Sequence, residues 1–263
     1  MAKLTPMMEQ YFEIKNKYKD CILFYRLGDF YEMFYEDALT ASKELEITLT
    51  GKNCGQEERA PMCGVPFHSC EPYINKLVEK GYRVAICEQV EDPKAAKGIV
   101  KRDVIRVVTP GTNTLTQSLD ETKNNYIMSV FCENDKFGVA ICDLSTGEFR
   151  TTQVEYQDAL LDELNKFQPA EIICNDGFCI CGMDFEYIRE KIGAIITPVA
   201  SYYFEMDHCE KMIQEQYHLR NLEGIGLKDY PFGIIASGSL LQYLHETQKT
   251  SLAHLMELIP YST

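Results

Sequence analysis

A polar, turn-rich tract near the middle of the chain is the feature that most limits how it can fold. Residues 109–125 are rich in threonine, asparagine, proline and glycine, a composition typical of a linker. At 263 residues, with 45% hydrophobic residues, the chain can form two domains that each bury a core. We therefore predict a first domain over 1–112, a linker over 113–125, a second domain over 126–250 and the start of a further region over 251–263.

The residues before this tract alternate between short apolar runs and segments with helical periodicity. Thr5 followed by Pro6 is typical of a helix start, and Gly81 of a helix end. Alternating strands and helices predict a mixed α/β domain. We expect helices over 7–18, 30–46 and 71–80, and strands over 21–25, 47–50, 62–65, 83–89 and 104–108.

The residues after the tract begin with three strand-like segments, the first two joined by a short polar turn, which is a hairpin signal. Helices and strands then alternate. Three antiparallel strands followed by this alternation is the order of a ribonuclease-H-like sheet, so this domain is also predicted to be α/β. The expected strands are 126–132, 137–143, 148–154, 171–174 and 194–199, and the expected helices are 157–167, 183–191, 204–219 and 233–248.

The apolar runs and the cysteines indicate where such a chain works. No run approaches the roughly 18 apolar residues of a membrane helix, and the first residues lack an apolar signal region. The 11 cysteines are irregularly spaced, and the closest pair is Cys179 and Cys181. A disulfide framework or zinc site would show regular pairs. We expect a cytoplasmic protein with reduced thiols, no membrane contact, and no metal or other cofactor bound to this chain.

The net charge of −14 is unevenly divided. Residues 1–115 hold 16 Lys and Arg against 17 Asp and Glu, whereas residues 116–263 hold 10 against 23. Phosphates would repel the second part. Any contact with nucleic acid is therefore expected in the first part, through a local basic surface, and high affinity would need help from elsewhere.

One short segment carries the most functional information. An apolar run ends at Gly28, and we expect a helix to start at once, with Asp29 as its cap and Glu32 completing a variant of the capping box. This interpretation does not explain Phe30, because an aromatic ring at a first helical position gains little from facing water. Phe30 either packs under a neighbouring loop or acts as a wedge that enters a DNA minor groove.

The wedge hypothesis has a physical basis. Unstacking a base step costs a few kcal/mol, and less where pairing is already faulty. A ring that entered everywhere equally would not discriminate, so selectivity must come from the cost of deforming the DNA. Glu32, two residues on, would be repelled by phosphates unless a disturbed base offers it a donor or it takes up a proton. It would therefore penalise well-paired DNA.

Several segments, in order, resemble the MutS mismatch-recognition family. Residues 28–32 (Gly-Asp-Phe-Tyr-Glu) look like the Phe-x-Glu motif of that family. A lone Phe-x-Glu would be weak evidence, but ordered matches over nearly the whole chain identify it as a member. The other matching segments are 5–11, 60–68, 84–93, 108–112 and 143–149.

The resemblance implies a function and assigns residues to it. It implies a mismatch-recognition domain followed by a ribonuclease-H-like connector domain, with Phe30 as the stacking wedge and Glu32 as the base-contacting acid. It also implies contacts to the DNA backbone, for which Lys101 and Arg102 are the favoured pair, although each basic candidate could equally be a solvated surface charge. The full set of backbone candidates is Lys52, Arg59, Lys97, Lys101, Arg102 and Arg106.

The resemblance further implies parts that lie outside this chain. Family members bind ATP and Mg²⁺ through a C-terminal domain, and no phosphate-binding glycine motif occurs here, because Gly51-Lys52 is followed by Asn53. We therefore expect no enzyme activity from this fragment. The complete protein is expected to form a homodimer on mismatched DNA. Its partners would be downstream repair proteins such as MutL, with the acidic connector as one docking surface.

Two other classes of function remain open from the residues alone. A metal-dependent nuclease could use Asp143, with Glu148 and Asp135 nearby, but the opening strand 126–132 contains no acid and a turn role suffices for Asp143. Alternatively, the chain could be a protein-docking fragment without a DNA role.

Overall fold

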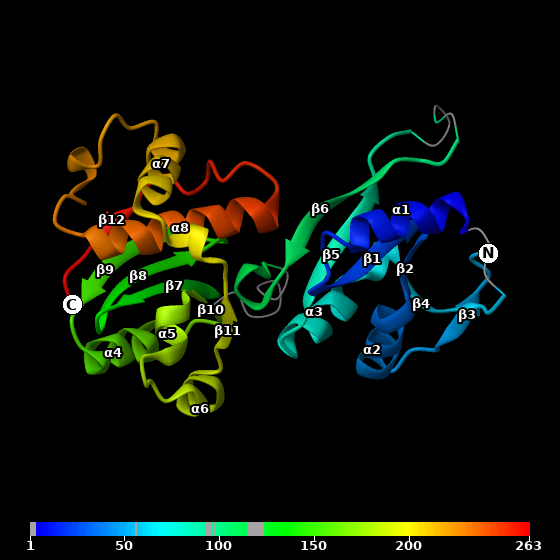
Figure 1. The fold of residues 1–263 in the computed structure, drawn as a ribbon, viewed down its shortest axis with the longest axis horizontal. Coiled ribbons are helices and arrows are strands. Elements are labelled where there is room, and N and C mark those ends of the chain that lie inside the picture. Colours follow the sequence, from blue (N-terminus) through cyan, green and yellow to red (C-terminus); the bar gives the residue numbers. More distant parts are fainter. Residues whose placement is uncertain (1–3, 56, 93–95, 97, 115–123) are drawn as a thin grey trace. The chain divides into compact units, whose positions relative to one another are not determined.

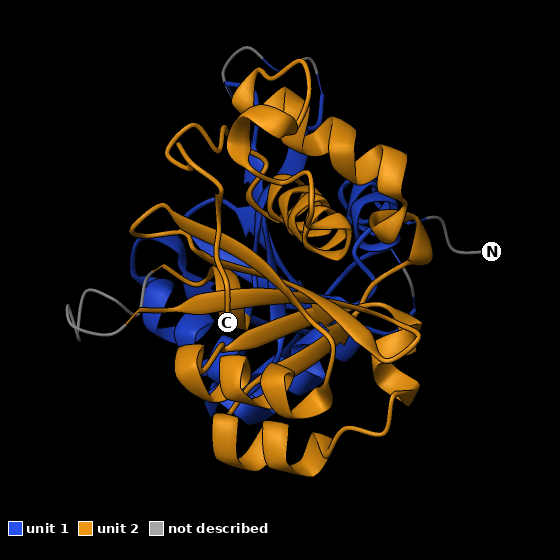
Figure 2. Ribbon diagram, turned by 90° about the vertical axis from the view of Figure 1, so that its left-hand side faces the viewer, with its two compact units in different colours: residues 1–109 blue, residues 110–263 orange. Residues whose placement is uncertain are grey.

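The structure, a computed structural model, describes residues 4–55, 57–92, 96, 98–114 and 124–263. The chain forms two compact units, unit 1 over residues 1–109 and unit 2 over residues 110–263, coloured separately in Figure 2. Both units combine helices with a six-stranded sheet, so the predicted α/β class is confirmed. No helix within the described residues is both long and apolar enough to cross a membrane.

Unit 1 is built on a mixed sheet with the strand order β3-β4-β2-β1-β5-β6 (Figure 1). Strands β1 and β5 run parallel, and every other neighbouring pair is antiparallel. The strands are β1 Cys21–Leu27, β2 Phe30–Phe34, β3 Thr50–Lys52, β4 Ala60–Pro66, β5 Arg83–Gln89 and β6 Arg102–Val108. The helices are α1 Pro6–Lys15, α2 Tyr35–Leu45 and α3 Glu71–Glu79.

Helices cover the two faces of this sheet unequally. Helices α2 and α3 pack on one face, in a core that includes Tyr31 and Met33 of β2. On the other face α1 packs alone, and its Met8 and Tyr11 join a core with Phe34. Within the described residues, two helices thus pack on one face of the sheet and one helix of 10 residues packs on the other.

The helix expected over 30–46 begins only at Tyr35, and the preceding residues form strand β2 instead. Strands β1 and β2 form a hairpin that pairs Leu27 with Phe30 across the turn. Gly28, at φ +56°, allows a two-residue turn of the kind that matches strand twist. Asp29 is therefore a turn residue, and its assignment as a helix cap was wrong.

Unit 2 has a sheet with the order β11-β10-β7-β8-β9-β12. The strands β7, β8 and β9 are antiparallel neighbours, whereas β10 and β11 run parallel to β7. This is the predicted ribonuclease-H-like arrangement. The strands are β7 Tyr126–Glu133, β8 Lys136–Asp143, β9 Glu148–Val154, β10 Glu171–Cys174, β11 Ile195–Pro198 and β12 Ile259–Pro260.

Helices lie on both faces of the unit 2 sheet (Figures 1 and 2). One face packs with α7 and α8 in a large core, and the other packs with α4 and the short helices that follow it. The helices are α4 Gln157–Phe167, α5 Asp176–Ile180, α6 Phe185–Tyr187 with a π turn over Ile188–Ile192, α7 Met206–Tyr217 and α8 Pro231–Gln248.

A buried acid ties the start of unit 2 to its sheet. Glu171 is fully buried, and it accepts hydrogen bonds from the Gly111 backbone N–H (3.0 Å), the Thr197 hydroxyl (3.0 Å) and the Tyr243 hydroxyl (2.6 Å). Residues 110–112, expected at the end of the first domain, thus belong to unit 2. Most of the expected linker, residues 115–123, lies outside the described residues.

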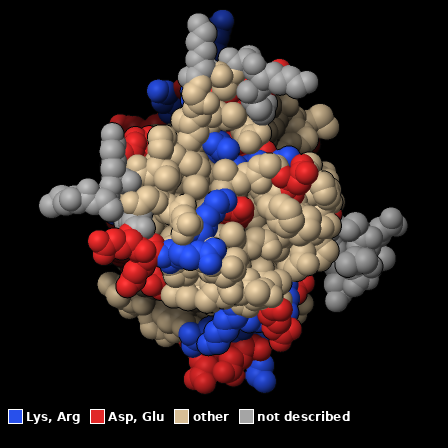
Figure 3. Space-filling view, turned by 90° about the vertical axis from the view of Figure 1, so that its right-hand side faces the viewer, with Lys and Arg blue, Asp and Glu red and all other residues tan. Residues whose placement is uncertain are grey.

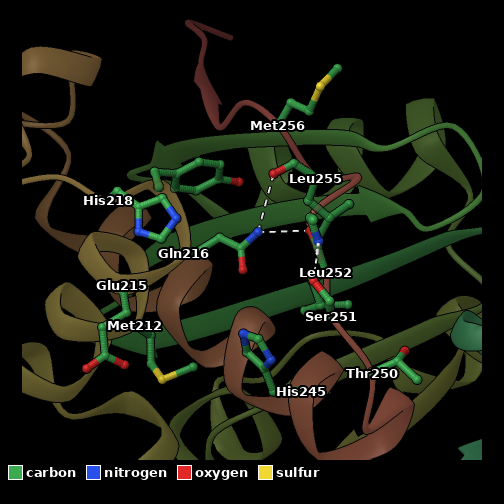
Figure 4. Close-up of a pocket in the computed structure, with 12 residues that line it drawn as sticks. Met212, Glu215, Gln216, His218, His245, Thr250, Ser251, Leu252, Leu255 and Met256 are labelled. Atoms are coloured by element: carbon green, nitrogen blue, oxygen red, sulfur yellow. Dashed lines mark hydrogen bonds between the residues drawn. The ribbon is translucent and has the colours of Figure 1, made fainter.

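The last residues, which we expected to begin a further region, also pack within unit 2. Leu252, Leu255 and Leu258 are buried in the core that contains α7 and α8. The Gln216 amide on α7 donates to the carbonyl oxygens of Leu252 (2.9 Å) and Leu255 (3.4 Å), beside a cavity of about 530 Å³ (Figure 4). The apolar spacing of these leucines reflects packing onto unit 2 without a regular helix.

Candidate nucleic-acid interface

The hairpin of β1 and β2 places the two proposed DNA-reading residues on one face of the unit 1 sheet. Side chains alternate along a strand, so Phe30, Glu32 and Phe34 share a face, and Tyr31 and Met33 share the other. Phe34 is buried against Tyr11 of α1, with ring centroids 5.1 Å apart. Phe30, at the far end of the strand, is 47% exposed. A ring at this position is accessible to a ligand.

A glycine on the neighbouring strand leaves space beside both side chains. Gly64 of β4 pairs with Glu32, and a Cβ atom there would lie 3.6 Å from Glu32 Cγ and 3.8 Å from the Phe30 ring. A side chain larger than that of alanine at position 64 would crowd Glu32 and Phe30. Phe30 and Glu32 therefore both lie next to Gly64 on one face of the sheet.

Glu32 is held by an ion pair. Lys52 Nζ lies 2.5 Å from Glu32 Oε2, and the two side chains are 32% and 15% exposed respectively. Lys52 Nζ also lies 5.8 Å from the centre of the Phe34 ring. Lys52, expected to contact a phosphate, thus neutralises Glu32, the proposed base-contacting acid, in the free protein.

The hairpin turn is braced by residues that the sequence analysis gave no role. The Arg26 guanidinium lies 3.3 Å from the Phe67 ring centroid, and its Nε donates to the Gly28 carbonyl oxygen at 2.6 Å. The Phe67 backbone N–H donates to the Asp29 carbonyl oxygen at 3.0 Å. These contacts fix both carbonyls of the turn, so Phe30 projects from a rigid support.

Glu88 of β5 completes the brace from the other side of β1. It lies 3.1 Å from the Arg26 guanidinium and accepts a hydrogen bond from the Tyr31 hydroxyl. Burial, together with this carboxylate, raises the pKa of Tyr31, so the hydroxyl stays protonated as a donor. Phe67 and Glu88 both lie in segments that resemble the family, and that resemblance was their only sequence signal.

The six basic candidates for DNA backbone contacts prove to be structurally different from one another. Arg59 is exposed and donates to the Gly51 carbonyl oxygen, and Lys101 is exposed at the base of the β5–β6 loop. Arg106 is half-buried, and burial lowers its pKa. Lys97 lies outside the described residues. Arg59 and Lys101 are therefore the most accessible of the described candidates.

The expectation that Arg102, one of the favoured pair, contacts the DNA backbone is wrong. Its residue is only 8% exposed, and its guanidinium donates to the carbonyl oxygens of Arg26 (2.7 Å) and Val100 (2.9 Å) and to Gln10 (3.1 Å). It also lies 5.1 Å from the Tyr25 ring. A guanidinium with these internal partners serves the packing of α1 and β1, and it is not placed to reach a phosphate.

Positive and negative side chains are interspersed on the face of the described residues that Figure 3 shows. On the face shown in Figure 3, Lys and Arg side chains lie near the middle and Asp and Glu side chains lie close beside them. This mixture agrees with the near balance of charge over residues 1–115. Any attraction of this face to an anionic ligand would therefore be local.

Asp143 and Glu148 of unit 2 are cross-strand partners on β8 and β9, but within the described residues they do not belong to the larger cluster of acids that a two-metal nuclease requires. Asp143 Oδ1 accepts hydrogen bonds from the Ser145 N–H (2.9 Å) and hydroxyl (2.6 Å), and Glu148 pairs with Arg150. Among the residues that the structure describes, no three His, Cys, Asp or Glu side chains are grouped to hold a metal ion. The nuclease alternative is not favoured, and Asp143 serves the turn after β8.

Comparison with known proteins identifies both units. Residues 5–117 match the family model of MutS domain I, and residues 125–256 match that of MutS domain II. The chain is thus a two-domain segment of the kind found in DNA-repair proteins. It belongs to the MutS family.

Curated relatives match the chain over its whole length. It is 57% identical over 263 residues to the DNA mismatch repair protein MutS of Lachnoclostridium phytofermentans, covering 100% of this chain and 28% of the relative. It is 51% identical to the protein of the same name from Acetivibrio thermocellus, covering 99% and 30%. For the Clostridium perfringens protein the values are 50%, 99% and 28%. The chain therefore spans less than a third of these relatives.

Proposed function

We propose that this chain is the mismatch-sensing and connecting part of a DNA mismatch-repair protein. Phe30 is the wedge that enters the minor groove at a mispaired or unpaired base, and Glu32 contacts that base. The observation that carries the proposal is the exposed Phe30 ring on a braced hairpin, next to a half-buried carboxylate on the same sheet face. Family membership supports the same reading.

Selectivity arises from the DNA rather than from the ring. Opening a base step costs a few kcal/mol, and faulty pairing lowers that cost. A rigid wedge cannot yield, so the duplex must supply the whole deformation. The contacts from Arg26 and Phe67 to the turn meet this requirement. Well-paired DNA resists the ring, and a mismatch admits it.

The remaining functions belong to the complete protein. We propose that it is a homodimer in which one subunit inserts Phe30, and that ATP with Mg²⁺, bound outside this chain, converts recognition into a signal. Unit 2 would act as the connector and as a docking surface for repair proteins such as MutL. Its strongly negative charge supports this division, because an acidic domain is kept away from phosphates and left free for protein partners.

Replacement of Glu32 tests the role of the carboxylate. In the full-length protein we expect Glu32→Ala to bind fully paired DNA as tightly as wild type or up to about tenfold more tightly, because removal of the carboxylate leaves the Lys52 ammonium free to attract phosphates. Its preference for mismatched DNA should narrow. Fluorescence anisotropy with matched and mismatched duplexes measures both effects.

Glu36→Ala is the matched control for this experiment. Glu36 is exposed on α2, on the other side of the unit 1 sheet. The Glu36→Ala substitution therefore removes the same charge from the same unit, away from the proposed site. If the two variants change the affinity for paired DNA alike, the effect is a general charge effect and Glu32 has no special role.

A further inference from the structure

We propose that the ion pair between Lys52 and Glu32 is a latch that opens when Glu32 takes a donor on a mispaired base, which makes Lys52 a specificity-determining residue. This inference rests on the proposed function of Glu32. It assigns to Lys52 an exchange of partners: the carboxylate in the free protein and a DNA phosphate in the mismatch complex.

The geometry of the sheet supports a direct and specific pair. Glu32 is on β2 and Lys52 is on β3, and the two strands flank β4. Their partners on β4 are Gly64 and Ala60, which are four residues apart with Met62 between them on the same face, so the two side chains approach each other diagonally across β4. The Lys52 ammonium and the Glu32 carboxylate meet at 2.5 Å.

The surroundings make the pair stronger than an exposed one. The Glu32 side chain is 15% exposed, and the Lys52 ammonium is 5.8 Å from the Phe34 ring, which also favours the cation. Partly buried charges are screened less by salt than surface charges are. Opening this pair therefore has a cost that a new partner for Glu32 must offset.

The two kinds of duplex differ in whether they offer that partner. A paired base has its donors engaged, so on matched DNA Glu32 remains with Lys52 and the phosphates meet a neutral pair. A rotated, mispaired base presents a free donor, and Glu32 can then leave Lys52. The released ammonium is a cation next to the phosphate backbone, where it gains a contact. Binding to a mismatch thus includes the rupture of the pair, and binding to matched DNA does not.

A double-mutant cycle on the full-length protein isolates this difference. The variants are Lys52→Met, Glu32→Gln and the double substitution, each measured on a duplex with one G·T mismatch and on its fully paired counterpart. On paired DNA we expect Lys52→Met to weaken binding by the same factor in the wild-type background and in the Glu32→Gln background. The two factors should agree within about twofold. On mismatched DNA the loss of affinity caused by Lys52→Met should be about fivefold smaller in the wild-type background than in the Glu32→Gln background. The reason is that the Lys52→Met protein has no ion pair to break when it binds.

The controls separate the latch from simpler roles. Lys52→Arg keeps the charge and should behave as wild type within about twofold on both duplexes. If the coupling between the two positions is the same on both duplexes, whether zero or not, the pair does not open on recognition and the latch is wrong.

Phe30→Ala is measured in the same series, so that the proposed wedge function of Phe30 and the proposed latch can be tested separately. If Phe30→Ala retains the preference for the mismatch, the proposed function fails. If Phe30→Ala loses that preference and the coupling is still equal on both duplexes, only the latch fails.

Discussion

Phe30→Ala in the full-length protein is expected to abolish the preference for mismatched over paired DNA. An aromatic ring stacked on a base contributes roughly 1–3 kcal/mol, which corresponds to a loss of about 5- to 150-fold in affinity for the mismatched duplex. Affinity for paired DNA should hardly change, because the ring does not enter it. Dissociation constants measured on the two duplexes at one salt concentration give both values.

The substitution should leave the fold intact, so lost discrimination cannot be attributed to unfolding. Phe30 is 47% exposed, and its strand is held by pairing with β1 and β4. Leu39→Ala is a suitable control, since Leu39 is 42% exposed on α2 in the same unit. A Phe30→Ala variant that still discriminates as the Leu39→Ala variant does would show that the ring is not the wedge.

The sequence also carries a signal for this hairpin, which competes with the signal for the helix expected over 30–46. Two apolar runs separated by Gly-Asp are typical of a two-residue β turn. The capping pattern of Asp29 and Glu32 predicted a helix instead, and the helix that does form begins at Tyr35. Local capping signals were outweighed here by the pairing of β2 with two neighbouring strands, a tertiary effect that a local pattern does not contain.

The residues around the site show a second limit of sequence reasoning. Residue type predicts that an arginine is charged, but not whether it meets solvent or a buried carbonyl. Arg102 satisfies three internal acceptors, and Lys52 meets Glu32 from another strand. Both outcomes depend on which strands are neighbours. By contrast, β9 and α4 match their predicted bounds, because regular periodicity within one segment is sufficient to define them.

A large effect on stability is expected at the contact between α7 and α8. A Cβ atom at Gly238 of α8 would lie 2.3 Å from Cys209 Cα and 2.6 Å from the Cys209 carbonyl oxygen of α7. These are backbone atoms of a neighbouring helix, so they cannot rotate away as a flexible side chain could. Alanine is intrinsically better than glycine in a helix by about 1 kcal/mol, but here the collision decides the sign.

We therefore expect Gly238→Ala to lower the free energy of unfolding of this chain by about 3 kcal/mol, because α7 and α8 must move apart over a close-packed core. Urea titration followed by circular dichroism measures the loss. Gly224→Ala makes the same chemical change where a Cβ atom meets nothing within 4 Å, and it should alter stability by less than about 0.5 kcal/mol. Equal stability of the two variants would mean that the helices are not in backbone contact, and the tight packing of α8 against α7 would then have to be abandoned.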